Sequence, residues 1–425
     1  MLKLLRLRNF RLLALGQGIS VLGDQFHLIA LPWLVLQLTG NALATGTVLG
    51  MAGIPRAAFM LFGGALTDRL SPRSVMLASN VLRFALVAFL ATLVLTGSVA
   101  LWMLYIFALI FGLVDAFFYP AASAIVPQIV ARDDLQAANS LNGATAQLSI
   151  FVGPVLAGTM IALLAGGTGV AGEQAVPDQQ GIGIAFVVDA ISFLCSALTL
   201  WLVRLSRDGM QPSVAGGKQG VWLDIREGLA ASWRDPAARI VLLLVAVINL
   251  CAMGPFVVGI PVLARSRFPE GALAFGIIMS AYGGGLLFGT LVAGAAPKPS
   301  PSRLGPTAVL MVGVVGVGLV LLGFVPSTVL AATTAVVMGA ANGYRLILFI
   351  SWLQRRTPRA MLGRMMSLVM FAAVGLVPVS TALAGALIGL DLTALFAGAG
   401  SLLALAAVIA AMHPAIRAMG IETSP

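Results

Sequence analysis

Apolar runs of about twenty residues or more recur from one end of the chain to the other, separated by short polar segments. Each run is long enough to cross about 30 Å of hydrocarbon as a helix. Strands are excluded because lipid offers no hydrogen-bond partners to their exposed backbone. The pattern therefore predicts an all-α membrane protein with twelve transmembrane helices. We place them at 11–38, 42–66, 74–97, 101–127, 136–164, 181–203, 239–264, 271–295, 304–324, 327–352, 362–389 and 392–412.

Composition agrees with this class. Of the 425 residues, 60% are hydrophobic and only 9% are charged. A chain this long and this apolar is not a single soluble core.

The positive charge follows the topology expected of such a protein. The chain carries 25 Lys and Arg against 15 Asp and Glu, a formal net charge of +10. With a cytoplasmic N-terminus, all but five of the basic residues fall in cytoplasmic segments. The exceptions are Arg265 and Arg267 outside, and Arg56, Arg83 and Arg345 within spans. This bias predicts that both termini are cytoplasmic. No basic face marks a soluble nucleic-acid module, so nucleic acid is not an expected partner.

The longest cytoplasmic segment, 206–238, divides the spans six and six. We expect an N-terminal half at 1–205 and a C-terminal half at 239–425. Four apolar residues of the segment recur at helical spacing opposite charged ones: Trp222, Ile225, Leu229 and Trp233. This spacing predicts an amphipathic helix on the membrane surface. The helix is either a plain linker or a regulatory, partner-binding element.

The two halves share identities when one is shifted by 227 residues. The matched positions are Ser140-Leu141 with Ser367-Leu368, Leu156-Ala157-Gly158 with Leu383-Ala384-Gly385, Gly112 with Gly339, and Asp115 with Asn342. Repeated six-helix halves are typical of transporters with a site near the midplane.

Several short motifs accompany this repeat. They are Leu22-Gly23-Asp24, Gly64-x-Leu66-x-Asp68-Arg69-x-x-x-Arg73, Asp134-Leu135-x-x-Ala138-Asn139-Ser140-Leu141, Gly153-Pro154-x-x-x-Gly158, Gln354-x-x-Thr357-Pro358 and Gly363-Arg364. The set covers nearly the whole chain and resembles the drug:proton antiporter branch of the major facilitator superfamily, which includes macrolide and enterobactin exporters. Two positions depart from the family pattern: Ser71 replaces a usual Gly, and Pro72 stands where a basic residue is usual.

The resemblance implies twelve helices in two pseudo-symmetric six-helix halves that work by alternating access. It implies efflux of drugs or siderophore-like amphiphilic compounds from a bacterial cytoplasmic membrane, with the proton gradient as energy source and no cofactor. We expect a monomer in the lipid bilayer. Two other interpretations stay open: an importer or facilitator of a metabolite, and a receptor or scaffold on the same fold.

The motif between the second and third spans resembles a cytoplasmic gate. Gly64 allows close helix approach. Asp68 can accept hydrogen bonds from a helix N-terminus or pair with an arginine. Arg73 can meet the C-terminal dipole of another helix. Such contacts can form in one state and break in the other. The alternative is a positively charged loop with one incidental acid.

Gly153, Pro154 and Gly158 resemble the antiporter motif of the fifth helix. Proline removes a backbone donor and kinks a helix, and the glycines permit a close contact with the other half. The resemblance implies a seal against leakage. Proline and glycine are also frequent in ordinary membrane helices.

Two acids lie midway along spans, where an ionised side chain costs at least about 2.5–3.5 kcal/mol. They are Asp24 in the first span and Asp115 in the fourth. Our hypothesis is that one of them takes up a proton in exchange for outgoing substrate. The alternative makes Asp24 a structural partner of Arg56 or Arg83. Asp189 and Arg83, on the sixth and third spans, are expected at the periphery as members of structural pairs.

The resemblance implies that the first, fourth, seventh and tenth spans line the cavity. The candidates on these spans are His27, Phe111, Phe118, Tyr119, Asn249, Asn342 and Arg345. Aromatic rings near Asp115 would offer stacking and cation–π contacts. Arg345 either attracts an anionic substrate or holds Tyr344 and neighbouring carbonyls.

No motif indicates catalysis or ATP-driven pumping. The segment 216–219, GGKQ, lacks the first Gly and the hydroxyl residue of a nucleotide-binding loop. His27 and His413 lie at opposite ends of the chain, without a G-x-S-x-G elbow. Cys195 and Cys251 lie within separate spans and indicate neither a disulfide framework nor a metal cluster. We therefore expect a transporter with no catalytic and no metal site, not an enzyme.

Overall fold

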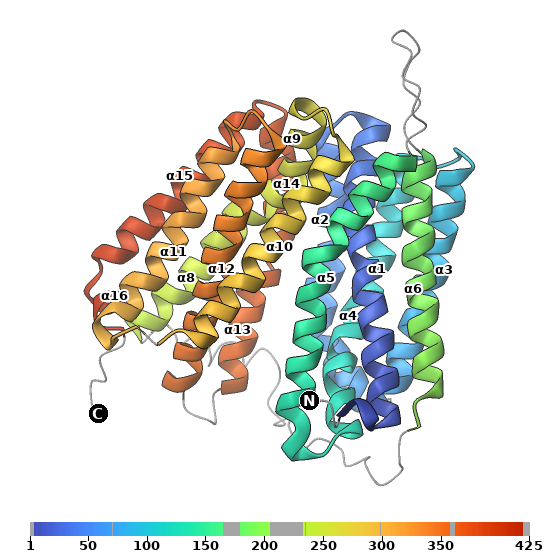
Figure 1. Cartoon of the computed structure of the whole chain (residues 1–425), viewed down its shortest axis with the longest axis horizontal. Helices are drawn as coiled ribbons and strands as arrows, with labels where there is room; N and C mark the ends of the chain where they lie inside the picture. Colours follow the sequence, from blue (N-terminus) through green and yellow to red (C-terminus); the bar gives the residue numbers. More distant parts are fainter. Residues whose placement is uncertain are drawn as a thin grey trace. The chain divides into compact units, whose positions relative to one another are not determined.

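The computed structural model of the chain describes residues 4–69, 71–164, 179–204, 233, 235–297, 299–357 and 362–419. Within these ranges the chain is almost entirely helical and has no strand, as the apolar runs predict. The helices form two compact units (Figure 1). The first comprises 1–216 with 270–280, and the second comprises 217–269 with 281–425.

Six long helices make up most of the first unit. They are α1 (Arg8–Thr39), α2 (Ala42–Arg69), α3 (Pro72–Leu95), α4 (Leu101–Ile129), α5 (Leu135–Leu164) and α6 (Gln179–Leu202). The short 3₁₀ turns η1 (Leu4–Arg6) and η2 (Arg132–Asp134) precede α1 and α5. Helix α1 packs on α5 and α6, α3 packs on α4 and α6, and α2 lies along α4.

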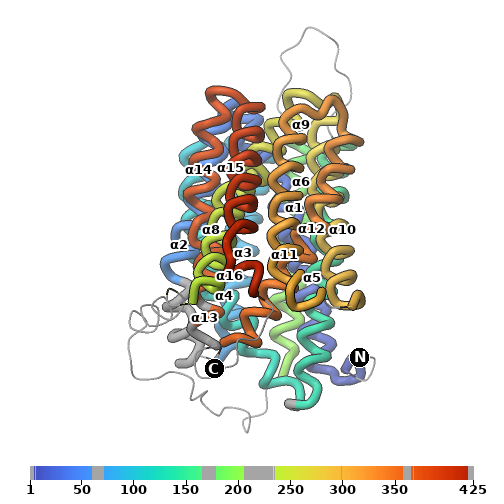
Figure 2. Tube along the Cα trace, turned by 90° about the vertical axis from the view of Figure 1, so that its left-hand side faces the viewer, coloured from blue at the N-terminus to red at the C-terminus, as the bar shows by residue number. Residues whose placement is uncertain are grey.

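The second unit holds the remaining helices. They are α8 (Pro236–Gly254), the π-helical turn η4 (Pro255–Gly259), α9 (Ile260–Arg267), α10 (Ala272–Ala295), α11 (Pro301–Leu322), α12 (Thr328–Arg356), α13 (Leu362–Val374), α14 (Val377–Ile388), α15 (Leu392–Met412) and α16 (Pro414–Arg417). The beginning of α10 belongs to the first unit. Within the second unit α11 lies between α12 and α15 (Figure 2).

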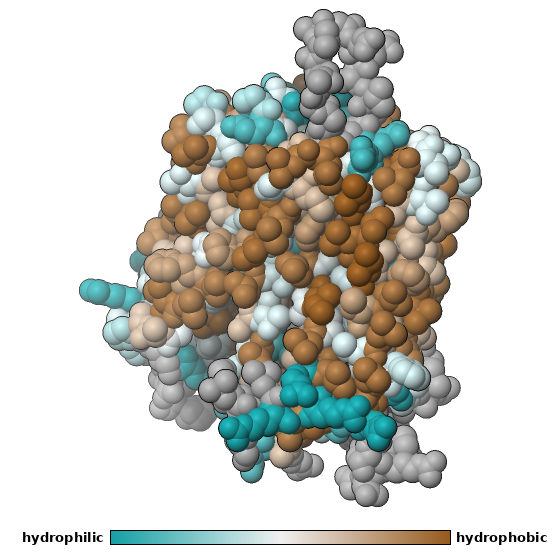
Figure 3. Space-filling model, turned by 45° about the vertical axis from the view of Figure 1, so that its right-hand side comes forward, coloured by the Kyte–Doolittle hydropathy of each residue, from teal (hydrophilic) through white to brown (hydrophobic). Residues whose placement is uncertain are grey.

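Eleven helical segments among the described residues are long and apolar enough to cross a membrane. They coincide with the predicted spans other than the second. There α2 is a 28-residue helix, of which the side chains of 60–69 lie outside the described residues. With α2 they make the predicted twelve membrane helices in two sets of six. The face seen in Figure 3 is hydrophobic across its middle, as lipid requires. Of the linker 206–238, the structure describes only Trp233 and residues 235–238, so the predicted amphipathic helix lies outside the described residues apart from Trp233.

Helix starts follow local capping chemistry. Ser71 caps α3 by accepting a hydrogen bond from the backbone N–H of Ser74, and Pro72 occupies the first turn, where its missing N–H costs nothing. The two departures from the family motif thus form a helix start. Asp235 caps α8 in the same way, and its carboxylate also pairs with Arg356 at the end of α12.

Glycines set the closest helix contacts in both units. A Cβ at Gly112 on α4 would overlap the carbonyl oxygen of Ala52 on α2. A Cβ at Gly339 on α12 would likewise overlap the carbonyl oxygen of Tyr282 on α10. Gly112 and Gly339 are equivalent in the 227-residue repeat, so the repeat conserves a backbone contact between a pair of helices in each unit.

Two membrane helices of the second unit are interrupted. The seventh span widens into a π-helical turn at Pro255, and the eleventh breaks between α13 and α14. The hydroxyl of Ser380 on α14 donates to the carbonyl of Leu250 and accepts from the N–H of Gly254. One side chain therefore satisfies backbone groups on α8 next to the π turn.

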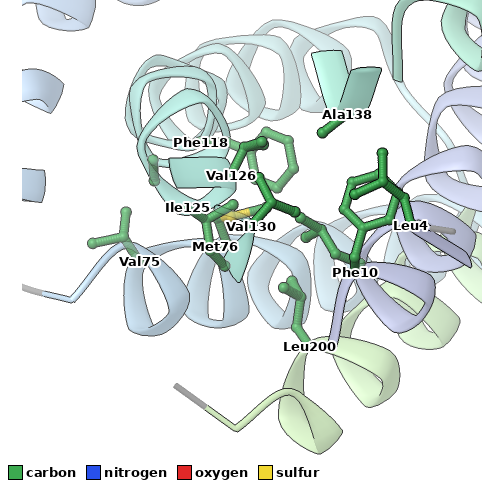
Figure 4. Packing of buried hydrophobic residues seen from close by; sticks show 12 residues of the cluster. Leu4, Phe10, Val75, Met76, Phe118, Ile125, Val126, Val130, Ala138 and Leu200 are labelled. Carbon is green, nitrogen blue, oxygen red and sulfur yellow. The ribbon is translucent and has the colours of Figure 1, made fainter. Parts of the chain in front are cut away.

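A hydrophobic cluster closes one end of the first unit. It joins α1, α3, α4, α5 and α6 through side chains that include Phe10, Met76, Phe118, Ile125 and Leu200 (Figure 4). Because Phe118 belongs to both this cluster and the polar interior described below, the cluster fixes the position of that interior.

We predict that Gly112→Ala destabilises the protein, because the added methyl group overlaps the backbone of α2. Overpacking of this kind costs about 1–3 kcal/mol. The matched control is Gly143→Ala on α5, where a Cβ meets open space. Thermal unfolding in detergent should show a lower Tm for Gly112→Ala and an unchanged or higher Tm for Gly143→Ala. Equal Tm values for the two variants would contradict the proposed contact.

Candidate functional site

Charged side chains from five helices of the first unit meet in its apolar interior. They are Asp24 and His27 on α1, Arg56 on α2, Arg83 on α3, Asp115 on α4 and Asp189 on α6. Ionised groups are costly at such a depth unless they are paired, so each of them needs a partner or a proton.

Asp115 is the shared partner of two arginines. One carboxylate oxygen pairs with Arg56 and the other with Arg83. Arg83 is only 2% exposed, and its guanidinium lies 4.0 Å from the ring centroid of Phe118 and 5.8 Å from that of Phe111. The aromatic faces add cation–π attraction to a charge-assisted pair. The sequence interpretation of Arg83 as peripheral is wrong, because its side chain points into the bundle.

The contact at Gly112 explains how Arg56 reaches this acid. Ala52 and Arg56 are one turn apart on α2, and Gly112 and Asp115 are one turn apart on α4. Because the two backbones touch at Ala52 and Gly112, the next turns bring the guanidinium to the carboxylate.

His27 and Asp189 form a second pair. Nδ1 of His27 lies 3.4 Å from Oδ2 of Asp189, whose side chain is fully buried. The imidazole stacks on Phe111 at 4.7 Å between ring centroids with 6° between the planes. The sequence predicts that Asp189 belongs to a structural pair at the periphery; the pair is confirmed, and the peripheral position is wrong. Neither of its carboxylate oxygens has a hydrogen-bond partner among the described residues. A proton held by His27 or Asp189 would relieve that unpaired charge.

Asp24 differs from the other acids. It lies one turn before His27 on α1 and is partly buried. Among the described residues, no basic side chain lies within ion-pair distance of its carboxylate; Arg56 and Arg83, its predicted alternative partners, both pair with Asp115. The adjacent Gly23 packs on Ser192 and Asp189 of α6, and a Cβ there would overlap the hydroxyl of Ser192.

A cavity of about 590 Å³ opens in the first unit between α1, α4 and α5. Its polar lining consists of Gln17, Tyr119, Ser123, Asn139, Asn142 and Thr145. Tyr119 joins the cavity to the ion cluster, because the Arg56 guanidinium lies 5.9 Å from its ring centroid. Phe111 and Phe118 instead pack against Arg83. Sequence reasoning missed most of this lining, although Asn139, Asn142 and Thr145 recur every third residue on the fifth span.

The candidates of the second unit divide between two places. Asn249 donates to the carbonyl of Val245 on its own helix, α8. Asn342 and Arg345, on α12, are linked to each other and to Tyr282 of α10. Tyr282, which the sequence did not suggest, packs on Phe256 with 4.5 Å between ring centroids.

The predicted gate is described in part. The side chains of Gly64, Asp68 and Arg69 lie outside the described residues. Arg73 makes the predicted contact with a helix C-terminus, donating to the carbonyls of Leu200 at 2.9 Å and Trp201 at 2.7 Å at the end of α6.

The fifth-helix motif is buried. A Cβ at Gly153 would lie 2.5 Å from Cβ of Gln25 on α1. One at Gly158 would lie 3.0 Å from Cα of Gly276, in the part of α10 that belongs to the first unit. After Pro154, the backbone N–H of Val155 donates to the Ser280 hydroxyl at 2.8 Å. Gly158 thus permits a backbone contact with α10, whereas Gly153 packs on a side chain of α1 in its own half.

Comparison with known proteins gives one consistent family. The profile of the Major Facilitator Superfamily matches residues 13–376. The chain is 28% identical over 413 residues to the multidrug efflux pump Tap of Mycolicibacterium fortuitum, with 95% of each chain covered. It is 20% identical over 279 residues to macrolide efflux protein A of Streptococcus pyogenes, covering 66% of this chain and 64% of that protein.

A solved structure supports the fold. The crystal structure of a bacterial homologue of the iron transporter ferroportin in the inward-facing state has a TM-score of 0.67 with this chain at 16% identity. The similarity covers 96% of this chain and 99% of the other.

The ion cluster predicts an order of stabilities. Asp115→Asn leaves the buried Arg83 and the partly buried Arg56 without their acid and should cost about 3–5 kcal/mol. Arg56→Gln should cost less, because Arg83 and Asp115 remain as a neutral pair and Arg56 is 32% exposed. Thermal unfolding of both variants in detergent measures the order. A loss at Arg56→Gln as large as at Asp115→Asn would show that Asp115 is not the shared partner.

Proposed function

We propose that this chain, which belongs to the Major Facilitator Superfamily, is a proton-coupled exporter of drugs or siderophore-like amphiphilic compounds. The family is one of membrane transporters, and relatives similar to the chain are named as efflux pumps for several drugs and for macrolides. These names favour export over import of a metabolite. The similarity to Tap extends over 95% of both chains, so it concerns the whole transporter.

The observation that carries proton coupling is the difference between Asp115 and Asp24. Asp115 is occupied by its ion pairs with Arg56 and Arg83. Asp24 has no such partner among the described residues and is only partly buried. An unpaired acid inside a membrane bundle is suited to bind and release a proton. We therefore assign proton binding to Asp24 and a structural role to Asp115.

His27 and Asp189 extend this assignment. They lie 3.4 Å apart and adjoin Asp24 through the contact of α1 with α6 at Gly23. A proton can therefore be held by Asp24 or by the His27–Asp189 pair without leaving the cluster. We propose that these three residues carry the coupling proton between the two faces of the membrane.

The substrate is assigned to the cavity of the first unit. Tyr119 places an aromatic ring between that cavity and the arginine–aspartate cluster. Occupation of the cavity can therefore affect the electrostatics of the proton site. We propose that the transporter works by alternating access, with the motif at 64–73 as a gate. Both termini lie in the cytoplasm of a bacterium in this proposal. The transporter works as a monomer and needs no cofactor besides the proton gradient.

Substrate-driven proton movement in inside-out vesicles tests the proposal. Asp24→Asn should reduce it at least about tenfold, because an amide cannot exchange a proton at this position. Binding of a fluorescent substrate by the purified variant should persist. The control is Asp391→Asn, since Asp391 is exposed and caps α15, a role that Asn fills equally well. Wild-type proton movement in Asp24→Asn would refute the assignment of Asp24. If no drug, macrolide or catecholate moves protons in the wild type, the antiport proposal fails.

A further inference from the structure

Arg345 is a buried cation without an acid. Arg345 is 5% exposed, and its Nη2 donates to Oδ1 of Asn342 at 2.6 Å. Nε and Nη1 are buried and have no hydrogen-bond partner among the described residues. No carboxylate of the described chain lies within ion-pair distance of it. Burying a guanidinium with unused donors and no counter-charge is costly in free energy, so a bound anion would stabilise this site.

The neighbours of Arg345 hold the guanidinium in place. The amide of Asn342 donates to the Tyr282 hydroxyl at 2.8 Å, which turns its carbonyl oxygen toward Arg345. The guanidinium carbon lies 5.3 Å from the ring centroid of Phe349. Tyr282 is in turn packed on Phe256. The sequence alternative, in which Arg345 holds neighbouring carbonyls, is not supported, because its hydrogen bond goes to an amide side chain.

The internal repeat shows what is missing at this site. Asn342 is the equivalent of Asp115, and each lies one turn after a glycine that touches a neighbouring helix. In the first unit the residue at this position is an acid that pairs with two arginines. In the second unit it is a neutral amide beside an arginine. No carboxylate among the described residues therefore compensates the positive charge of Arg345.

The unused donors have the geometry of a carboxylate site. A guanidinium has five N–H donors, arranged as two edges that share Nη2. Asn342 uses one donor of Nη2. Whichever Nη2 hydrogen it takes, the other edge keeps both of its donors. A carboxylate or a similar oxyanion binds such an edge with two parallel hydrogen bonds.

We propose that Arg345, held by Asn342 and Tyr282, binds an anionic group of the transported compound, so that the exporter selects amphiphiles carrying a carboxylate or a comparable oxyanion. This inference rests on the proposed export function and specifies its substrate class. An anionic lipid headgroup has similar chemistry, so the test separates lipid from substrate.

The test uses two rhodamine dyes that differ only in a free benzoate carboxylate and its methyl ester. Binding to the purified full-length protein is measured by fluorescence anisotropy in a neutral detergent. We expect the wild type to bind the acid at least about tenfold more tightly than the ester, since a charge-assisted pair contributes about 1.5–3 kcal/mol. Arg345→Gln should remove the preference and leave ester binding unchanged.

Two further variants keep the test independent of misfolding. Asn342→Asp supplies the missing acid from the chain, so Arg345 should pair with it and the preference for the acid dye should disappear in a folded protein. Arg355→Gln on the same helix is the matched control, because Arg355 is exposed and donates only within its own turn, to Ser351. It should bind both dyes like the wild type.

Three results would overturn the inference. They are equal affinity of the wild type for acid and ester, including no binding of either, a preference that survives Arg345→Gln, and loss of acid-dye binding when stoichiometric phosphatidylglycerol is added. The last would assign the site to lipid. Proton-driven export of the ester dye is measured separately in vesicles. If the ester dye is exported but the wild type shows no preference for the acid dye, this inference alone is refuted. If the acid dye is preferred but no proton-driven export occurs, the proposed function alone is refuted.

Discussion

One carboxylate shared by two arginines organises the polar interior of the first unit. Asp115 draws Arg56 from α2 and Arg83 from α3 onto α4, and neither arginine could remain in this apolar bundle without it. The glycine contact between α2 and α4 brings Arg56 to Asp115, and an aromatic ring packs against Arg83. The same packing that joins these helices therefore also positions the paired charges.

The pairing of both arginines with Asp115 determines which acids of the cluster lack a guanidinium partner. Since both arginines are committed to Asp115, Asp24 and Asp189 receive no guanidinium. Instead, the imidazole of His27 lies within 4 Å of the Asp189 carboxylate. In the proposed mechanism, proton binding at Asp24 and at the His27–Asp189 pair adjusts the charge of this cluster of six residues.

The sequence predicted the fold well because each membrane helix is specified locally, by about twenty apolar residues and by caps such as Ser71 and Asp235. It located Asp24 and Asp115 because charge is conspicuous in an apolar run. It did not assign their partners. The direction of Arg83 and Asp189 depends on how α3 and α6 rotate about their axes, which is set by contacts such as Gly23 with Ser192. Tyr282 was missed because a tyrosine in a membrane span carries no signal until Asn342 is placed beside it.

The two units share a scaffold and differ in where the balancing charge comes from. Gly112 and Gly339 make the same backbone contact, and the residue one turn later faces arginine in both units. In the first unit Asp115 supplies a negative charge from the chain. In the second unit Asn342 supplies none, because an amide orients Arg345 without neutralising it. A single oxygen-to-nitrogen difference between equivalent residues therefore separates a structural ion cluster from a site that requires a ligand. The same repeat can hold the bundle together in one half and select substrate in the other.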